Sequence, residues 1–232
     1  MATGLLYDVH GNLPALDAVL ADARSTPVTR WVLGGDYASF GAWPVEVVER
    51  MGALDNAVWI RGNWDRWQLG EREDMPPGED LQTALASVVE RLGPELIDRL
   101  AALPETHREG DVLFCHAAPH SDMNSFLPEP MASDDALLNG VDARRVVFGH
   151  THLPVDRDHN GIHLFNPGSV GLPFDSDTRA HWAVLHDDGR AELRRVAYDL
   201  DEAIGGLRDR YAGAPWIAGT IARLCKATFT GE

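Results

Sequence analysis

The 232-residue sequence predicts an α/β fold with a partly parallel sheet. Its N-terminal third alternates short apolar runs with amphipathic segments, an order that favours parallel strands connected by helices. Its later part contains apolar runs separated by Asn160-Gly161 and Asp187-Asp188-Gly189, turns that are typical of antiparallel hairpins. The chain shows no repeat, low-complexity tract or linker, so we expect residues 1–232 to form one domain.

The N-terminal third predicts a β-α-β-α-β unit. Strands are expected at 4–7, 30–33 and 57–60, where apolar residues run continuously. Residues 13–23 repeat apolar side chains at helical spacing, and the helix expected at 44–51 begins with a proline, which is favoured in the first turn. This order predicts strands whose carboxyl ends lie at the same edge of a sheet.

Further strands are expected in the second half of the chain. Apolar runs at 111–115 and 145–148 each lead into a histidine-containing motif. Beyond them, residues 162–165, 180–185 and 191–196 predict antiparallel strands because tight turns separate them.

Two helical regions complete the prediction. Residues 71–104 contain two amphipathic segments, 81–92 and 95–103, and we expect them to form a helical lid or an outer layer. Residues 200–232 predict C-terminal helices that are broken near Pro215.

The charge of the chain limits its partners. It has 20 basic and 36 acidic residues, a formal net charge of -16 and a pI of about 4.9. Long nucleic acids and anionic membranes are bound through Lys and Arg, so neither is an expected partner. A small phosphate ester is still compatible, because a bound cation reverses the local field.

Lysine and cysteine usage excludes some chemistry. Lys226 is the only lysine, which excludes a P-loop lysine and argues against a Schiff-base enzyme. Cys115 and Cys225 cannot form a disulfide framework, and we expect a reducing, cytoplasmic location. We find no signal-peptide pattern and no apolar stretch near the ~20 residues that a membrane span needs.

Five short motifs with metal-ligand side chains each follow an apolar run. Ligand sites in α/β sheets form at the carboxyl ends of strands, so these side chains can converge on one cleft. Their oxygens and imidazole nitrogens suit a divalent transition metal. The motifs are Asp8-Val9-His10, Gly35-Asp36, Gly62-Asn63-Trp64-Asp65, Cys115-His116 and Gly149-His150-Thr151-His152. We expect glycines 35, 62 and 149 to let the backbone turn sharply beside the metals.

Each motif alone has an ordinary interpretation. A lone Asp-x-His is usually surface polarity, a lone histidine after a strand is usually a hydrogen-bonded side chain, and Gly62-Asn63 alone is a turn. Five of them at successive strand ends are hard to attribute to chance. The set therefore predicts a metal-dependent hydrolase.

Together, the motifs resemble the calcineurin-like metallophosphoesterase superfamily. The run Asn166-Pro167-Gly168-Ser169-Val170-Gly171 is similar to that of its small bacterial and archaeal phosphodiesterase branch. The resemblance spans roughly residues 4–185. It implies an α/β (α+β) fold, in which a two-sheet β-sandwich of mixed strands is flanked by helices in αββα order.

The same resemblance implies a centre of two divalent ions, drawn from Mn, Fe, Co, Ni or Zn. A hydroxide between the ions would attack phosphorus in line with the leaving oxygen. We assign catalytic roles to Asn63, whose amide can donate to a phosphoryl oxygen, and to His116. The implied ligands are Asp8, His10 and His152 for the first ion, Asn63, His116 and His150 for the second, and Asp36 as the bridge.

Trp64 departs from the family pattern. Much of the superfamily has a histidine here that is proposed to protonate the leaving group, oriented by the following carboxylate. Indole cannot do this, because its N–H is not appreciably acidic near neutral pH. His120 is a candidate substitute by its proximity to His116. Trp64 could instead stack on a nucleobase or aromatic leaving group, or simply form the cleft wall.

A second departure argues against a protein phosphatase. Residues 37–41 lack the phosphate-clamping arginine that protein phosphatases of this superfamily carry after the motif of Asp36. Arg66 or Arg179 could contact the substrate, although each is also compatible with a surface role. We therefore expect small phosphodiesters or nucleotides as substrates.

Two alternatives differ in class. A non-catalytic scaffold of the same fold would tend to lose ligands, whereas all seven are present. A dinuclear hydrolase of amides or thioesters often needs a bridging lysine in mid-chain, and Lys226 is badly placed for it. Family members are often dimers or tetramers, so the resemblance also suggests a homo-oligomer.

Overall fold

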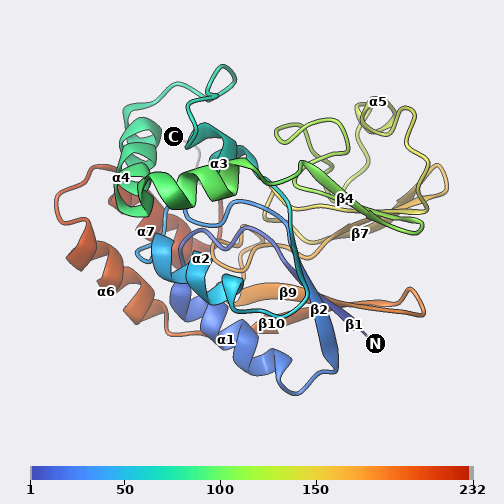
Figure 1. The fold of residues 1–232 in the computed structure, drawn as a ribbon, viewed down its shortest axis with the longest axis horizontal. Coiled ribbons are helices and arrows are strands. Elements are labelled where there is room, and N and C mark those ends of the chain that lie inside the picture. Colours follow the sequence, from blue (N-terminus) through green and yellow to red (C-terminus); the bar gives the residue numbers. More distant parts are fainter. Residues whose placement is uncertain (1, 230–232) are drawn as a thin grey trace.

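Two five-stranded sheets make up the centre of the computed structural model, which describes residues 2–229 (Figure 1). Residues 1 and 230–232 lie outside the described residues. They include both ends of the expected domain, 1–232, and the last residues of the expected C-terminal segment, 200–232. The elements are β1 (Ala2–Leu6), α1 (Leu13–Ala23), β2 (Val28–Leu33), α2 (Pro44–Gly52), β3 (Ala57–Trp59), α3 (Asn63–Trp67), α4 (Glu79–Ala101), β4 (Thr106–Glu109), β5 (Val112–Cys115), α5 (Asp134–Leu137), β6 (Arg145–Val147), β7 (Val155–His159), β8 (Ile162–Asn166), β9 (Ala180–His186), β10 (Ala191–Val196), α6 (Leu200–Arg210) and α7 (Trp216–Lys226).

Both sheets mix parallel and antiparallel strands. The first has the order β10-β9-β1-β2-β3, in which β1, β2 and β3 are parallel and β9 and β10 are antiparallel. The second has the order β4-β5-β6-β8-β7, with β5, β6 and β8 parallel and an antiparallel strand at each edge. The predicted two-sheet sandwich of mixed strands flanked by helices is confirmed.

Strand β1 shows why the two sheets pack face to face. Successive side chains of a strand point to opposite faces, and β1 is apolar at both. Leu5 packs with Phe114, Val147 and Phe165 of the second sheet, and all four are fully or almost fully buried. Leu6 faces the other way, into the cluster that α1 and α2 form on the outer face of the first sheet.

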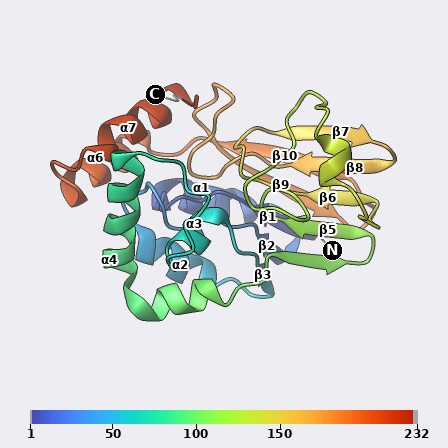
Figure 2. The same cartoon turned by 90° about the horizontal axis from the view of Figure 1, so that it is seen from above.

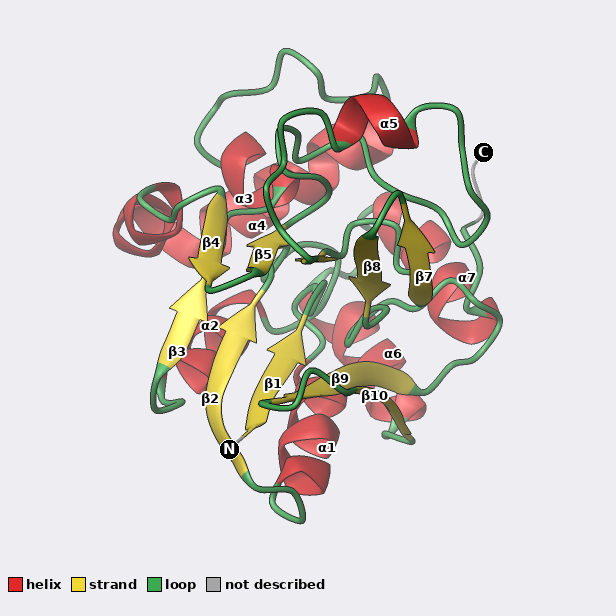
Figure 3. Cartoon of the chain, turned by 90° about the vertical axis from the view of Figure 1, so that its right-hand side faces the viewer, coloured by secondary structure: helices red, strands yellow, loops and turns green. Residues whose placement is uncertain are grey.

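The second sheet is covered on its outer face by an irregular segment. Phe126 and Leu138 of this segment, which includes α5, pack against Phe148 and Leu164. Figure 3 shows α5 and the surrounding loops over this part of the molecule. Each sheet is therefore covered on its outer face as well as on the face that meets the other sheet.

A group of helices caps one end of the sheets. Figure 2 shows α3, α4, α6 and α7 gathered there, and an aromatic cluster that includes Phe40, Trp64 and Trp216 joins them. The two helices expected at 81–92 and 95–103 appear as one element, α4, interrupted at Gly93, where φ is 70°. No helix within residues 2–229 is both long and apolar enough to cross a membrane.

Four short elements were not predicted. β4 and β7 are the edge strands of the second sheet, and α3 and α5 have five and four residues. Of these, α3 bears on function because Asn63 opens it.

We expect Leu5→Ala to lower the free energy of unfolding by about 2–5 kcal/mol, because it leaves a cavity between the sheets. Leu193→Ala is the matched control, since Leu193 lies on β10 with 40% of its surface exposed. Its cost should stay within about 0.5 kcal/mol. Urea unfolding of both variants measures the difference, and equal losses would contradict the inter-sheet packing.

Candidate metal centre

The seven predicted ligands lie at the carboxyl ends of strands from both sheets. Asp8 and His10 follow β1, Asp36 follows β2, Asn63 opens α3 beyond β3, and His116 directly follows β5. The loop after β6 carries the remaining pair, His150 and His152. All seven side chains are buried except that of His150, which is half-buried. Each predicted ligand therefore comes to one place.

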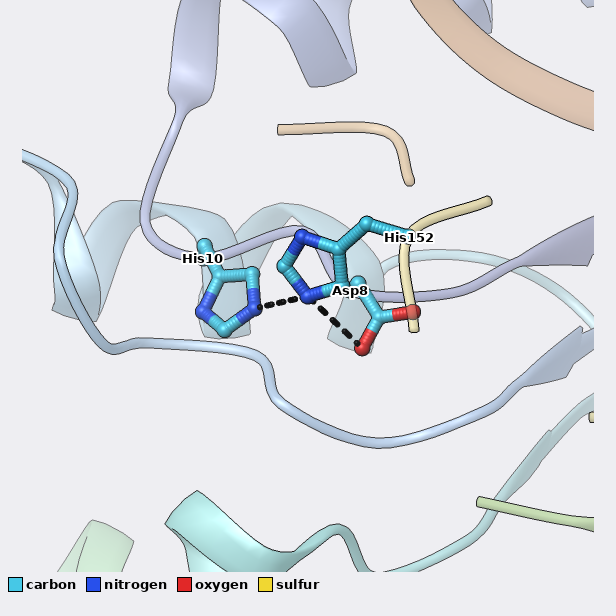
Figure 4. A group of neighbouring side chains, drawn as sticks. All are labelled: Asp8, His10 and His152. Atoms are coloured by element: carbon cyan, nitrogen blue, oxygen red, sulfur yellow. Dashed lines mark hydrogen bonds and ion pairs between the residues drawn. The ribbon is translucent and has the colours of Figure 1, made fainter. Parts of the chain in front are cut away.

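One group of ligand atoms belongs to Asp8, His10 and His152, which point toward one another (Figure 4). The Nε2 atoms of His10 and His152 are 3.0 Å apart. Asp8 Oδ1 lies 3.6 Å from Nε2 of His152.

A second group surrounds the side-chain oxygen of Asn63. Its Oδ1 lies 3.0 Å from Nε2 of His116 and 3.0 Å from Nδ1 of His150. Asp36 lies between the two groups, because its Oδ2 is 3.6 Å from Nε2 of His116 and 3.8 Å from Nε2 of His10. One carboxylate oxygen thus faces ligands of both groups.

The donor set fits a cation. The Nδ1 atoms of His116 and His152 lie 2.8 Å and 2.5 Å from the carbonyl oxygens of Gly34 and Leu172. A histidine that donates from Nδ1 to a carbonyl keeps a lone pair on Nε2. The lone pair of His152 faces Nε2 of His10 and a carboxylate oxygen of Asp8, and the buried Asp8 Oδ1 has no hydrogen-bond donor among the described residues. Acceptors facing acceptors without water are unfavourable unless a cation lies between them.

Burial keeps three of the histidines neutral. It lowers the pKa of His10 and of His150 to about 4, and that of His152 well below its usual value. A histidine binds a metal only as the neutral imidazole, so these side chains are ready ligands near neutral pH. Among the charges that lower the pKa of His10 is that of Arg223.

The two carboxylates share one histidine. Burial disfavours the His116 imidazolium, but the charges of Asp36 and Asp8 outweigh it and raise the pKa of His116 to about 10. Burial raises the pKa of Asp8, and the nearby Asp36 charge adds to the rise. For Asp36, His116 outweighs burial and holds the pKa below its usual range. Binding of a cation would therefore displace a proton from this group.

The ligand loops adopt a backbone conformation that is uncommon for side chains other than glycine. Five of the seven predicted ligands have φ between 47° and 66°. Such a residue costs about 1–3 kcal/mol and persists only where its surroundings fix it. Here the first two loops bind each other, since His10 N donates to Asp36 O at 3.0 Å and Asp8 N donates to Gly35 O at 3.2 Å. The five residues are Asp8, His10, Asp36, His150 and His152.

Asp65 supports Asp36 through the backbone. Its carboxylate accepts from the amides of Asp36 and Gly62, each at 2.9 Å, and of Tyr37 at 3.3 Å. In return, Asp36 Oδ1 accepts from the amide of Trp64 at 3.0 Å. Asp65 therefore has little capacity left to orient a side chain at position 64, the task its counterpart is proposed to have in much of the superfamily.

The Asn166–Gly171 motif holds the other ligand loops. Asn166 Nδ2 donates to the carbonyl of Gly149 at 2.9 Å, and Ser169 Oγ donates to the carbonyl of Asp8 at 2.7 Å. Asn12 donates to the carbonyl of Gly171 at 2.9 Å. The motif thus ties the first ligand loop to the last.

Gly62 and Gly149 leave room for ligand side chains. They do not form the sharp turns that the sequence predicted for them. Gly62 is extended, with φ of -94° and ψ of 174°, but a Cβ there would lie 2.3 Å from Asp36 Oδ1. A Cβ on Gly149 would lie 2.6 Å from Asp8 Oδ2. Gly35 does have a positive φ, 99°, as the turn prediction requires.

The two residues predicted on the substrate side occupy different environments. Trp64 is only 6% exposed, and its ring lies 4.4 Å from Phe40 and 5.2 Å from Trp67. His120 is exposed, and its Nε2 lies 3.2 Å from the carbonyl oxygen of Asn139. No hydrogen bond among residues 2–229 joins His120 to a ligand of the centre.

Three further residues near the ligands were not predicted. Ser39 Oγ lies 2.7 Å from Nδ1 of His10, and the ring of Phe174 stacks on His152 at 4.4 Å. Arg223 lies close enough to influence His10, although it comes from the last helix. Ser39 could have been noticed because it follows Asp36 closely, but the other two are far from their partners in sequence.

The chain is similar to known phosphoesterases. Residues 1–189 match the model of the calcineurin-like phosphoesterase superfamily domain. The chain is 29% identical over 220 residues to an uncharacterized protein of Methanocaldococcus jannaschii, covering 86% of this chain and 88% of that protein. It is 28% identical over 175 residues to the phosphodiesterase YfcE of Escherichia coli, covering 72% and 77%. A metallophosphoesterase structure from Sphaerobacter thermophilus matches with 27% identity and a TM-score of 0.82, covering 98% and 100%.

We expect Ser39→Ala to weaken metal binding by about 10-fold, because Ser39 orients the ring of His10 from behind. Titration against a chelating indicator measures the affinity. Ser125→Ala is the matched control, since Ser125 bonds to the carbonyl of Ala117 and contacts no predicted ligand. Equal affinities in both variants would contradict the orienting role of Ser39.

Proposed function

We propose a function for this chain from the premise that it belongs to the calcineurin-like phosphoesterase superfamily. The matched residues, 1–189, include all seven predicted ligands. Membership and the relationship to a phosphodiesterase indicate a metal-dependent phosphoesterase. We propose more specifically a centre of two divalent ions that hydrolyses small phosphodiesters or nucleotides.

The position of Asp36 is the observation that carries the two-ion proposal. The same oxygen, Oδ2, faces His10 of the first ligand group and His116 of the second at similar distances. A carboxylate shared by two ligand groups is the arrangement that a bridging ligand needs. We therefore propose Asp8, His10 and His152 for one ion, Asn63, His116 and His150 for the other, and Asp36 for both.

The bound ions would polarise the phosphoryl oxygens and lower the pKa of a bound water. The protein's own contribution is to hold the groups around the phosphate in place. Because Asn63 directs its Oδ1 toward His116 and His150, its amide N–H groups are left to donate to a phosphoryl oxygen. His116, whose Nε2 lies 3.6 Å from Asp36 Oδ2, helps to hold that carboxylate in position.

The substrate proposal has three supports. A named phosphodiesterase is among the relatives of the chain. The net charge of -16 disfavours long polyanions. Residues 37–41 also lack the phosphate-clamping arginine expected of a protein phosphatase.

Metal analysis combined with ester hydrolysis tests this function. We expect protein supplied with Mn, Ni, Fe or Zn to hydrolyse bis-p-nitrophenyl phosphate or p-nitrophenyl phosphate. Asp36→Asn removes a charge from both proposed ion sites, and we expect it to lower the rate by about 100-fold or more and to reduce the metal content. Bound metal without hydrolysis of either ester would instead favour the non-catalytic scaffold.

Trp64 predicts a preference among leaving groups. General acid catalysis is worth ~10²–10⁴-fold, and Trp64 cannot provide it, so esters with basic alkoxide leaving groups should react slowly. We expect Trp64→His to raise the alkyl-to-aryl rate ratio by about 10-fold to 10²-fold, the low end of the range for general acid catalysis, since Asp65 is already occupied by backbone amides.

Trp67→His is the control, because Trp67 is also a buried indole but bonds to Asp74 at 2.9 Å. Rates measured on methyl and p-nitrophenyl esters of the same phosphate give the ratio. A ratio that Trp64→His leaves unchanged would show that position 64 does not limit protonation of the leaving group.

A further inference from the structure

Arg223 is a half-buried cation on α7. No ion pair of Arg223 is found among residues 2–229, although the charge of Asp80 lies near enough to act on its pKa. Its guanidinium carbon lies 5.7 Å from the ring centre of Phe40 and 5.5 Å from that of Phe229. Its Nε is buried and finds no hydrogen-bond acceptor in the described part of the chain. A buried donor without an acceptor is unfavourable, and an acceptor supplied by a bound ligand would remove that cost.

Both aromatic rings that Arg223 contacts are linked by further ring contacts to ligands of the candidate centre. The ring of Phe40 lies 5.8 Å from that of His10. Phe229 lies 5.5 Å from Phe174, whose ring stacks on His152. Arg223 therefore lies on the side of the first ligand group, connected to His10 through one ring and to His152 through two.

The backbone after α7 fixes this placement. The carbonyl of Ala227 accepts from the amide of Ser176 at 2.7 Å, and Ala227 itself has φ of 48°. Ser176 follows Phe174 closely in sequence. The end of α7 is therefore joined to the loop that covers His152.

Other arginines that were considered for substrate binding are already paired. Arg66 contacts Asp122 at 2.6 Å and Asp74 at 2.7 Å, and Arg179 contacts Asp177 at 2.6 Å. In a chain with 36 acidic residues, a half-buried arginine without such a partner needs another explanation. Burial lowers the pKa of Arg223, which means that its charge is desolvated, and a bound anion would offset that cost.

We propose that Arg223 binds a phosphoryl oxygen of the substrate that the candidate metal centre holds. This proposal rests on the function proposed above. A guanidinium presents planar paired donors that match phosphate oxygens. Arg223 would thereby supply the phosphate contact that residues 37–41 do not, and it lies outside the residues that the family model matches, 1–189.

Phosphate binding tests the proposal without requiring turnover. Inorganic phosphate is titrated by calorimetry into Mn-loaded wild type, Arg223→Gln, Arg223→Lys and Arg208→Gln. We expect the dissociation constant for phosphate to rise about 10-fold or more in Arg223→Gln. The rise should be smaller in Arg223→Lys, which keeps the positive charge but not the planar paired donors. Arg208→Gln, an exposed change on α6, should bind like the wild type. Metal content and unfolding temperature should be the same in all four proteins.

The outcomes distinguish failure of the Arg223 assignment from failure of the proposed function. Unchanged phosphate affinity in Arg223→Gln would overturn the assignment while leaving the phosphoesterase function in place. An equal loss in Arg223→Gln and Arg223→Lys, accompanied by a lower unfolding temperature, would overturn it too, because it would identify a packing role against Phe40 and Phe229. Metal-loaded wild type that neither binds phosphate nor hydrolyses the test esters would contradict the proposed function and this inference together.

Discussion

Two buried carboxylates, those of Asp8 and Asp36, lie beside the single imidazole of His116, and much of the surrounding structure serves to hold them there. Like charges without water repel strongly unless hydrogen bonds or cations offset them. The backbone amides of Trp64 and His150 each donate to one of the two carboxylates at 3.0 Å. Those amides follow β3 and β6, which belong to different sheets, so the centre requires both sheets to be packed correctly.

This dependence makes the loops mutually supporting. The ligand loops after β1 and β2 bond to each other, and the Asn166–Gly171 motif joins the loop after β1 to the loop after β6. The helical cap adds a third layer of support, because Phe40 and Trp64 belong both to its aromatic cluster and to the surroundings of the centre. Metal ligation and fold stability therefore draw on many of the same contacts.

The ligand cluster was predictable because strand ends carry their polar residues in a short, regular pattern after apolar runs. The edge strands β4 and β7 were not, because Thr106–Glu109 and Val155–His159 are mostly polar, as exposed edges often are. The environment of Trp64 was also hidden, since its neighbour Phe40 comes from another loop. Arg223 could not be found from the sequence, because helical periodicity identifies a buried face but not the distant ring that it meets.

The left-handed backbone at the ligand positions limits how such a centre can change over evolutionary time. Glycine, asparagine and aspartate tolerate that conformation far better than β-branched residues do. A lineage that lost the metal would therefore tend to keep short polar residues or glycine at positions such as 8, 36 and 150. The loops would retain their shape after their chemistry was gone, and a former enzyme could persist as a stable binding module.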